Sequence, residues 1–309
     1  MCRVLMYAGK PALLDDLLYR PDNSLIRQTT DAQLLNMLNI GGFGIAAWDA
    51  ASHDPRTPFL YRSGHVSVFD RNLKSLARKL IVTGLIAHVR GVAYHERTTV
   101  GEQNAHPFQF EGCPLALAHN GELTDFNRMR YLLVPYITPA IAQQIRGNTD
   151  SEWIYALLAS QFDWTSAPTM DVLSVCVERT LAILHDVRRT AGISTCSPVN
   201  LFISDGEDLL GVRYTFDFGC YDTQHEDPQP FGNAVHRYLS LWYTLGGDYG
   251  LHDGEWKMTG GLRNADSLMV ASEPLTRDTS TWLEVPEYSL FHTVRDAGRL
   301  AVKVRYLGE

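Results

Sequence analysis

The sequence lacks a long uninterrupted apolar segment. Apolar residues make up 45% of the 309 residues, but no run approaches the roughly 18 consecutive apolar residues that indicate a transmembrane helix. The first residues, MCRVLMYAGKP, contain no long apolar region and no small-residue cleavage site of the kind that secretory signals carry. We therefore expect no membrane span and no secretory signal.

Cysteine is also sparse, and no two cysteines form a C-x-x-C pair. An odd, scattered set in a long chain is typical of reduced thiols, so we expect a cytoplasmic protein without disulfides or a zinc knuckle. His225, His236 and His252 near Cys220 match no metal-binding spacing, and we expect no metal and no organic cofactor. The five cysteines are Cys2, Cys113, Cys176, Cys196 and Cys220.

Basic residues are outnumbered by acidic ones. The chain has 27 Lys and Arg against 35 Asp and Glu, which gives a formal net charge of -8. This balance disfavours binding to nucleic acid or to an anionic membrane. Internal repeats are absent, and no glycine-rich phosphate-binding loop or dinucleotide fingerprint follows residue 160.

Short apolar runs bounded by turn residues predict several β-strands. Residues 200–216 contain two such runs around Ser204-Asp205-Gly206, which predicts a hairpin. Residues 299–307 alternate apolar and basic side chains, as expected of an edge or half-exposed strand. Further strands are predicted at 85–93, 114–120 and 267–275.

Two segments have the spacing of long helices. Residues 149–162 begin with Thr149 and Glu152 at capping-box spacing, and residues 171–189 carry apolar residues at helical intervals. Strands with a few long helices but no regular βαβ alternation predict an α+β fold, with antiparallel sheets covered by helices. The expected buried faces are Ile154, Leu157, Leu158 and Gln161 in the first helix, and Val172, Val175, Cys176, Ile183, Leu184 and Val187 in the second.

Cys2 is a candidate nucleophile. Aminopeptidases remove Met1 when a small residue follows, and Cys2 would then carry a free α-amine beside its thiol. An α-amine has a pKa near 8, so a neutral fraction is present at working pH to take the thiol proton directly or through a water. The thiolate is the attacking form of cysteine. The alternative is a cysteine that stands at position 2 by chance.

Arg90 and Asp150 each admit a binding role and a structural one. Arg90 follows a predicted strand in AHVRG, where a guanidinium fork suits a carboxylate, although such an arginine is commonly a surface ion-pair residue. Asp150 stands at the start of a predicted helix, where acidic residues are favoured by capping and by the helix dipole. Neither residue alone predicts a function.

Asn120 and Gly121 end a predicted strand in LALAHNGEL. An Asn-Gly pair commonly forms a hairpin turn. The same pair can present a carboxamide and a glycine N–H to a developing oxyanion, because glycine lets the backbone approach a ligand closely. The sequence around Asn120 leaves both interpretations open.

The order of the motifs is more specific than any one of them. Cys2 is followed by HVRG, NAHPF, AHNGEL and NTDSE in that order. This ensemble resembles the glutaminase domain of the class II glutamine amidotransferases, which are N-terminal nucleophile hydrolases. SLMVASEPLT, Trp282 and VPEYSL extend the resemblance, and together with the opening MCRVLMYAGKP they are similar to stand-alone members such as the γ-glutamyl amidohydrolase of ergothioneine biosynthesis.

The resemblance implies a four-layer αββα sandwich of two antiparallel sheets and a role for each motif residue. It implies that Cys2 is the nucleophile and that Asn120 and Gly121 stabilise the oxyanion. Arg90 would bind the α-carboxylate of a glutamyl group and Asp150 its α-ammonium. His106, within NAHPF, is interpreted as a residue that shapes the pocket, without a part in proton transfer.

Two positions depart from the family pattern. Ala93 stands three residues after Arg90, where family members often carry Thr or Asn. The segment Gly41-Gly42-Phe43-Gly44 lacks the acidic residue of an Asp-Gly-Trp-Gly pattern. These departures indicate a pocket that is looser for glutamine or adapted to a modified γ-glutamyl group.

We expect residues 2–309 to form one domain with a loop insertion around 217–260, since 217–232 is polar, acidic and rich in turn formers. Its aromatic residues either cover the site and set specificity or complete an ordinary core. These residues are Phe216, Phe218, Tyr221, Phe231, Tyr238, Trp242 and Tyr243.

Three functions remain open at this stage. The favoured one is hydrolysis of a γ-glutamyl amide through a thioester, which releases glutamate and an amine or ammonia. The second is a glutaminase subunit that delivers ammonia to a separate synthase. The third is a catalytically silent binding protein that retains Met1.

Overall fold

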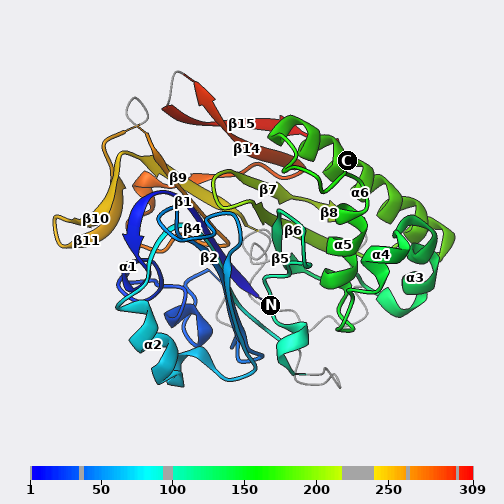
Figure 1. The fold of residues 1–309 in the computed structure, drawn as a ribbon, viewed down its shortest axis with the longest axis horizontal. Helices are drawn as coiled ribbons and strands as arrows, with labels where there is room; N and C mark the ends of the chain where they lie inside the picture. The colour runs from blue at the N-terminus through cyan, green and yellow to red at the C-terminus, as the bar shows by residue number, and fades with distance from the viewer. Residues whose placement is uncertain are drawn as a thin grey trace, which may run out of the picture.

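The computed structural model describes residues 2–34, 38–92, 100–217, 240–261, 265–296 and 299–308. Within these residues the chain is an α+β structure built on two antiparallel sheets (Figure 1). The predicted fold class is therefore confirmed.

The first sheet has seven strands in the order β13-β9-β12-β1-β4-β2-β3. The chain enters it at once, because β1 begins at Arg3 and lies between β12 and β4. The bounds are β1 Arg3–Leu13, β2 Phe43–Trp48, β3 Phe59–Ser63, β4 Ile81–Val89, β9 Trp242–Gly246, β12 Ser267–Ala271 and β13 Leu283–Glu284.

The second sheet has the strand order β15-β14-β7-β6-β5, and β8 pairs with β6 beside this path. A separate hairpin of β10 and β11 stands apart from both sheets. The bounds are β5 Ala116–Gly121, β6 Ser197–Ser204, β7 Leu209–Arg213, β8 Thr215–Phe216, β10 Asp248–His252, β11 Glu255–Thr259, β14 Ser289–Asp296 and β15 Arg299–Tyr306.

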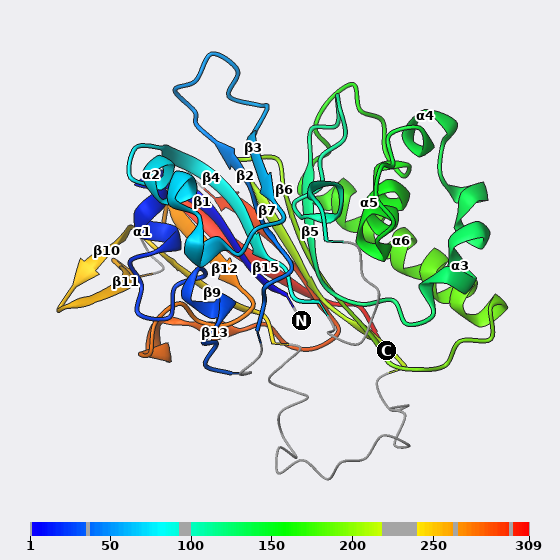
Figure 2. The same ribbon diagram turned by 90° about the horizontal axis from the view of Figure 1, so that it is seen from below.

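Helices cover the outer face of each sheet, which gives four layers (Figure 2). Helices α1 and α2 pack on the first sheet, and α3, α5 and α6 pack on the second. The bounds are α1 Leu14–Leu18, α2 Arg71–Ala77, α3 Phe126–Leu133, α4 Pro139–Ala142, α5 Asp150–Ala159 and α6 Met170–Thr190. The short 3-10 turns are η1 Arg27–Thr29, η2 Ser67–Phe69, η3 Glu102–Asn104, η4 Val134–Tyr136 and η7 Thr279–Thr281.

The alternation of side chains along β1 explains the layering. Val4 and Met6 point into the layer between the sheets, whereas Leu5 and Tyr7 point toward α1 and α2. Successive side chains of a strand face opposite sides, so a strand that is apolar at every position must be covered on both faces. The same double burial holds for β5, where Ala116 and Ala118 face the other sheet and Leu117 faces α5.

The predicted strands are all present, with shifted ends. The hairpin around Ser204-Asp205-Gly206 joins β6 to β7, and the Asp205 carboxylate accepts the backbone N–H groups of Glu207 and Asp208 at 3.0 and 2.8 Å. This local bond gives the turn its shape. The last predicted strand, β15, lies at the edge of the second sheet, where Val304 and Tyr306 are exposed.

The two long helices exist, and Ile154, Leu157 and Leu158 of α5 and Cys176, Leu184 and Val187 of α6 are buried as predicted. In α6 the buried side runs through Leu173, Val177 and Leu181, whereas Val172 and Val175 are 49% and 42% exposed. An apolar-rich helix offers two adjacent stripes of similar hydropathy, and contact with the second sheet selects one of them. Helix α5 is buried around its whole circumference, because α3, α4, α6 and β5 surround it.

The expected insertion around 217–260 is described only in part. Residues 218–239 lie outside the described residues, and with them Phe218, Tyr221, Phe231 and Tyr238. The described remainder contains β9, a strand of the first sheet, and the β10–β11 hairpin. Of the aromatics, Phe216 packs in the core between the second sheet and its helices. Trp242 and Tyr243 pack against the other two cores, one on each face of the first sheet.

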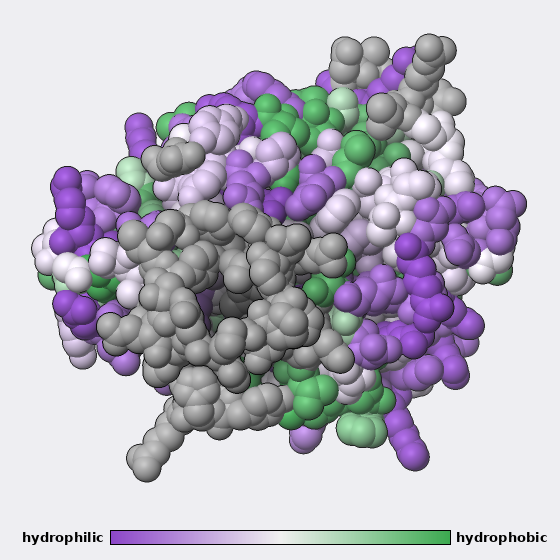
Figure 3. Space-filling view, turned by 180° about the vertical axis from the view of Figure 1, so that it is seen from behind, coloured by the Kyte–Doolittle hydropathy of each residue, from purple (hydrophilic) through white to green (hydrophobic). Residues whose placement is uncertain are grey.

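On the face shown in Figure 3, apolar side chains of the described residues lie in separate patches among polar ones. Across the described ranges, no helix is long and apolar enough to cross a membrane.

The layer between the sheets predicts a large effect at Phe202, which is fully buried there. We expect Phe202→Ala to lower the free energy of unfolding by about 3–5 kcal/mol, because it removes buried apolar area and leaves a cavity. Phe69→Ala is the matched control, since Phe69 is 82% exposed, and it should change stability by less than about 0.5 kcal/mol. Urea denaturation of both variants measures the difference, and equal values would contradict this packing.

Candidate active site

Cys2 lies immediately before β1, with its side chain 9% exposed. Its thiol donates to the Gly91 carbonyl at 3.9 Å, and its own carbonyl accepts from the Arg3 guanidinium at 3.0 Å. The buried Arg3 also forms an ion pair with Glu273 at 3.5 Å. These contacts hold the start of the chain against the end of β4, between the two sheets (Figure 2).

Arg90 is next to Cys2 because Arg3 of β1 pairs with Val89 of β4. Its backbone is held on both sides, with its N–H donating to Gly42 at 2.8 Å and its carbonyl accepting from Gly41 at 2.7 Å. Burial lowers the pKa of the Arg90 guanidinium, while the nearby Cys2 and Asp150 side chains raise it. The structure thus brings these three predicted residues together.

The glycine segment beside Arg90 explains one departure from the family pattern. A β-carbon on Gly41 would lie 2.6 Å from Val92, and one on Gly44 would lie 2.1 Å from the His106 carbonyl. A side chain at Gly41 would require the Val92 side chain to move, and one at Gly44 would require the backbone to move. Ala93, the other departure, lies outside the described residues.

Asn120 and Gly121 form the last two residues of β5, so the hairpin alternative is wrong. Both pair with β6, and the chain then runs into α3. The Asn120 carboxamide nitrogen donates to the Ser272 hydroxyl at 3.1 Å, which leaves its second N–H available because an amide nitrogen carries two. A β-carbon on Gly121 would lie 2.0 Å from the Pro198 carbonyl, so glycine is required there.

Ser272 connects Asn120 to the first strand. Its hydroxyl also accepts the Val4 N–H at 3.1 Å, its own N–H donates to the Val4 carbonyl at 3.0 Å, and its carbonyl accepts from Ser240 at 2.8 Å. Sequence reasoning missed Ser272, Ser240 and Glu273. The signal for Ser272 and Glu273 was their place in the SLMVASEPLT motif, whereas the chain around Ser240 carries no recognisable motif.

Asp150 lies at the first turn of α5, after the N-cap Thr149. Its carboxylate accepts the Leu123 N–H at 2.7 Å and the Ser151 N–H at 2.8 Å. It therefore ties the segment that follows Gly121 to the helix, and its charge raises the pKa of Arg90.

The capping box at Thr149 is formed only in half. The Thr149 hydroxyl accepts the Glu152 N–H at 3.3 Å as predicted. The Glu152 carboxylate instead accepts the N–H groups of Arg146 and Gly147 at 2.9 and 2.6 Å. It thus holds the loop before the helix rather than the N-cap residue.

Three buried histidines lie behind these residues. The His88 and His106 rings are 4.1 Å apart, and His106 also packs edge-on against Phe108 at 4.8 Å. His119 contacts Ser151 at 2.9 Å through its Nδ1. Burial lowers the pKa of all three histidines, well below the usual value for His88 and His106, whose pKa values the nearby Arg90 lowers further.

The neutral state of these histidines is favoured because a charge in this layer would be desolvated beside Arg90. Within the described residues, neither ring nitrogen of His88 or His106 has a hydrogen-bond partner. No group of three His, Cys, Asp or Glu side chains in the described part of the chain is arranged to hold a metal. The described cysteines, Cys2, Cys113, Cys176 and Cys196, are free thiols.

The chain is similar to known proteins in sequence and in fold. The sequence profile of the class II glutamine amidotransferases matches residues 41–218, more than half of the chain. The chain belongs to this family. Its members are enzymes that act on amide C–N bonds, and the fold is that of the N-terminal nucleophile hydrolases.

Relatives of known sequence or structure cover nearly the whole chain. The probable glutamine amidotransferase DUG3 of Saccharomyces cerevisiae is 28% identical over 94% of this chain and 81% of its own length. A glutamine aminotransferase class-II domain protein from Silicibacter pomeroyi has a TM-score of 0.58, 21% identity and 98% coverage of both chains. Glutamine phosphoribosylpyrophosphate amidotransferase of B. subtilis has a TM-score of 0.57 and 17% identity, over 99% of this chain and 49% of that one.

The buried histidines predict a dependence of stability on pH. Unfolding returns each ring to water, where its pKa is near 6.5, so below that pH the unfolded chain binds protons that the folded chain excludes. The free energy of unfolding should therefore fall by about 1.4 kcal/mol per pH unit for each such histidine. In denaturation series between pH 7.5 and 5.5, His106→Gln should lower this slope by the contribution of about one histidine. His65→Gln replaces an exposed histidine and should leave the slope unchanged. An unchanged slope in His106→Gln would mean that His106 is protonated in the folded state.

Proposed function

We propose that the protein hydrolyses a γ-glutamyl amide with Cys2 as nucleophile. The observation that carries this proposal is the Ser272 hydroxyl, which accepts both the Asn120 carboxamide and the N–H of Val4, two residues after Cys2. The thiol and a carboxamide donor are thereby fixed to one point between the sheets. Such a pair suits attack on a carbonyl and stabilisation of the oxyanion that results.

The reaction needs the free α-amine of Cys2, hence removal of Met1. The amine takes the thiol proton as sulfur attacks the amide carbon, and the carbonyl oxygen becomes an oxyanion facing the Asn120 carboxamide and the Gly121 N–H. The amine then gives the proton to the departing nitrogen, and the C–N bond breaks to leave a γ-glutamyl thioester. Water attacks the thioester by the same steps and releases glutamate and the thiol.

Recognition of the glutamyl group is assigned to Arg90 and Asp150. A glutamyl headgroup is a zwitterion, and this pair supplies one cation for its carboxylate and one anion for its ammonium. The support is that the Cys2 and Asp150 side chains both lie close enough to Arg90 to raise its pKa. We assign His106 a positioning role, because it packs between His88 and Phe108 and is kept neutral.

A second function is favoured by one comparison. The chain matches about half of the B. subtilis phosphoribosylpyrophosphate amidotransferase, so the same glutaminase unit could deliver ammonia to a synthase on a separate chain. The two functions differ in whether activity needs a partner.

We also propose a cytoplasmic location, a single domain over residues 2–309 with an insertion around 217–260, and catalysis without a metal or organic cofactor.

Intact-mass analysis tests the nucleophile. The purified protein is treated with 6-diazo-5-oxo-norleucine, a glutamine-like electrophile. We expect loss of Met1 and a single adduct that depends on Cys2, so that Cys2→Ala gives no adduct while Cys113→Ala labels as the parent does. Retention of Met1 without an adduct would favour the silent binding protein.

The oxyanion role of Asn120 predicts a loss in kcat. Asn120→Ala should lower kcat for glutamine hydrolysis by about 10²–10³-fold with little change in KM, because the donor acts mainly in the transition state. Ser272→Ala keeps the carboxamide but removes its anchor, and we expect a smaller fall in kcat. Steady-state kinetics with glutamine measure both. A rise in KM alone for Asn120→Ala would assign that residue to substrate binding instead.

A further inference from the structure

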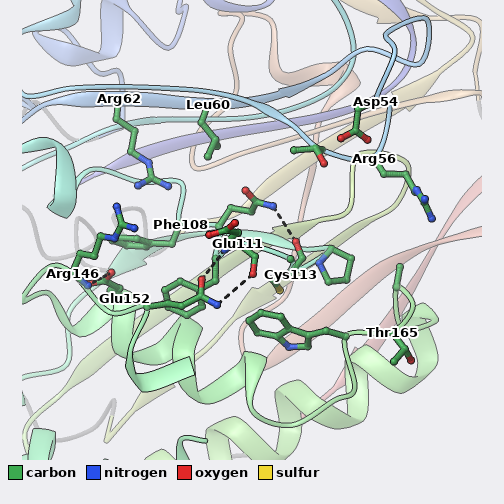
Figure 4. A pocket seen from close by; sticks show the side chains of 18 of the residues that line it. Asp54, Arg56, Leu60, Arg62, Phe108, Glu111, Cys113, Arg146, Glu152 and Thr165 are labelled. Carbon is green, nitrogen blue, oxygen red and sulfur yellow. Dashed lines mark hydrogen bonds between the residues drawn. The ribbon is translucent and has the colours of Figure 1, made fainter. Parts of the chain in front are cut away.

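A cavity opens at the edge of the sandwich, apart from the candidate active site. It has a volume of about 820 Å³ and lies between β3, the segment 108–114 and the start of α5 (Figure 4). We call it the edge cleft. Neither Cys2 nor Arg90, Asn120 or Asp150 lines it. Its existence is therefore not explained by the proposed chemistry.

Two guanidinium groups converge at one end of the edge cleft. Figure 4 shows Arg62, from β3, and Arg146, from the loop before α5, pointing toward one another above Phe108 and Glu152. Across the described part of the chain, neither guanidinium donates a hydrogen bond or joins an ion pair, and the Nε of Arg62 is buried without a partner. The Arg62 guanidinium lies over the face of Phe108, 5.9 Å from the ring centre.

The charges around this end leave an excess of positive charge. Glu152 is the nearby acid, and its carboxylate, which accepts the backbone N–H groups of Arg146 and Gly147, offsets one of the two guanidinium charges. Burial lowers the pKa of Arg62, Glu152 and then Tyr155 raise it, and Arg146 lowers it by a smaller amount. Like charges brought together in a partly desolvated cavity are unfavourable unless an anion joins them.

The walls of the cleft suit the body of a small molecule. Phe108, Phe110 and Trp164 supply aromatic surface, and Gln109 supplies an amide. Asp54 and Arg56 lie at the opposite end of the cleft, and the Glu111 carboxylate lies between the ends (Figure 4). A ligand that is anionic at one end and apolar or aromatic beyond it fits this order of groups.

We propose that the edge cleft binds the carboxylate or phosphate of a small organic anion between Arg62 and Arg146. A planar guanidinium fork matches both oxyanions. The ligand is either a separate small molecule or a distant part of the substrate held at Cys2. The cleft connects to the candidate active site through packed rings, since Phe108 contacts His106 and His106 contacts His88.

Calorimetric titration of the full chain with benzoate and with phenylphosphate tests the site. We expect a Kd on the order of 1 mM for these small probes and no binding of benzyl alcohol, which has the ring without the anion. Arg62→Gln and Arg146→Gln should each weaken binding at least about tenfold. Arg56→Gln, at the far end of the same cleft, is the matched control and should stay within about twofold.

Arg146 is exposed, so Arg146→Gln keeps the test valid even if Arg62→Gln fails to fold. Equal binding of benzyl alcohol, no binding of either anion, or unchanged affinity in both arginine variants would overturn the proposal.

A second titration uses protein alkylated at Cys2 by 6-diazo-5-oxo-norleucine. Unchanged anion binding assigns the ligand to a separate molecule, and mutual exclusion assigns it to a remote part of the substrate. The first titration needs no reaction at Cys2, so failure of the proposed hydrolysis and failure of this site are distinguishable.

Discussion

Ser272 makes the contact on which the geometry of the candidate site depends. Its hydroxyl accepts from Asn120 in one sheet and from Val4 in the other, at a place where both sheets end. Side-chain hydroxyls can accept two such bonds at once, and a buried donor left without an acceptor is destabilising by about 1–3 kcal/mol. The relative position of Cys2 and Asn120 is therefore set by one oxygen atom, backed by Ser240 and by the Arg3–Glu273 ion pair.

The sequence predicted the strands and the buried face of α5 well and that of α6 only in part, for physical reasons. A strand such as β5 is short, apolar and bounded by turn residues, so its existence follows from local pattern. The buried side of α6 does not follow from local pattern. Val172 and Leu173 are similarly apolar, and only the position of the second sheet decides which of them is covered. Glu152 shows the same limit, since its spacing from Thr149 fits a capping box but its carboxylate binds the preceding loop.

The candidate site was predicted from motif order rather than from any local signal. Arg90 and Asp150 are far apart in the sequence, and each alone is compatible with an ordinary structural role. The pairing of β1 with β4 and the start of α5 bring them close to one another and to Cys2. Ser240 could not be predicted, because its contact with Ser272 depends on the whole arrangement of the first sheet. Likewise, the edge cleft is formed between β3 and the loop before α5, and no sequence pattern predicts that these two segments lie together.

Helix α5 places two carboxylates of opposite orientation on its first turn. Asp150 reaches the segment after Gly121 on one side, and Glu152 reaches the loop of Arg146 on the other. Both depend on the same N-cap, Thr149. An evolutionary change that lengthens, shortens or rotates this turn would alter the candidate active site and the edge cleft together. The two sites are thus constrained to diverge as a unit, and a lineage could retune one of them alone only through residues outside the helix.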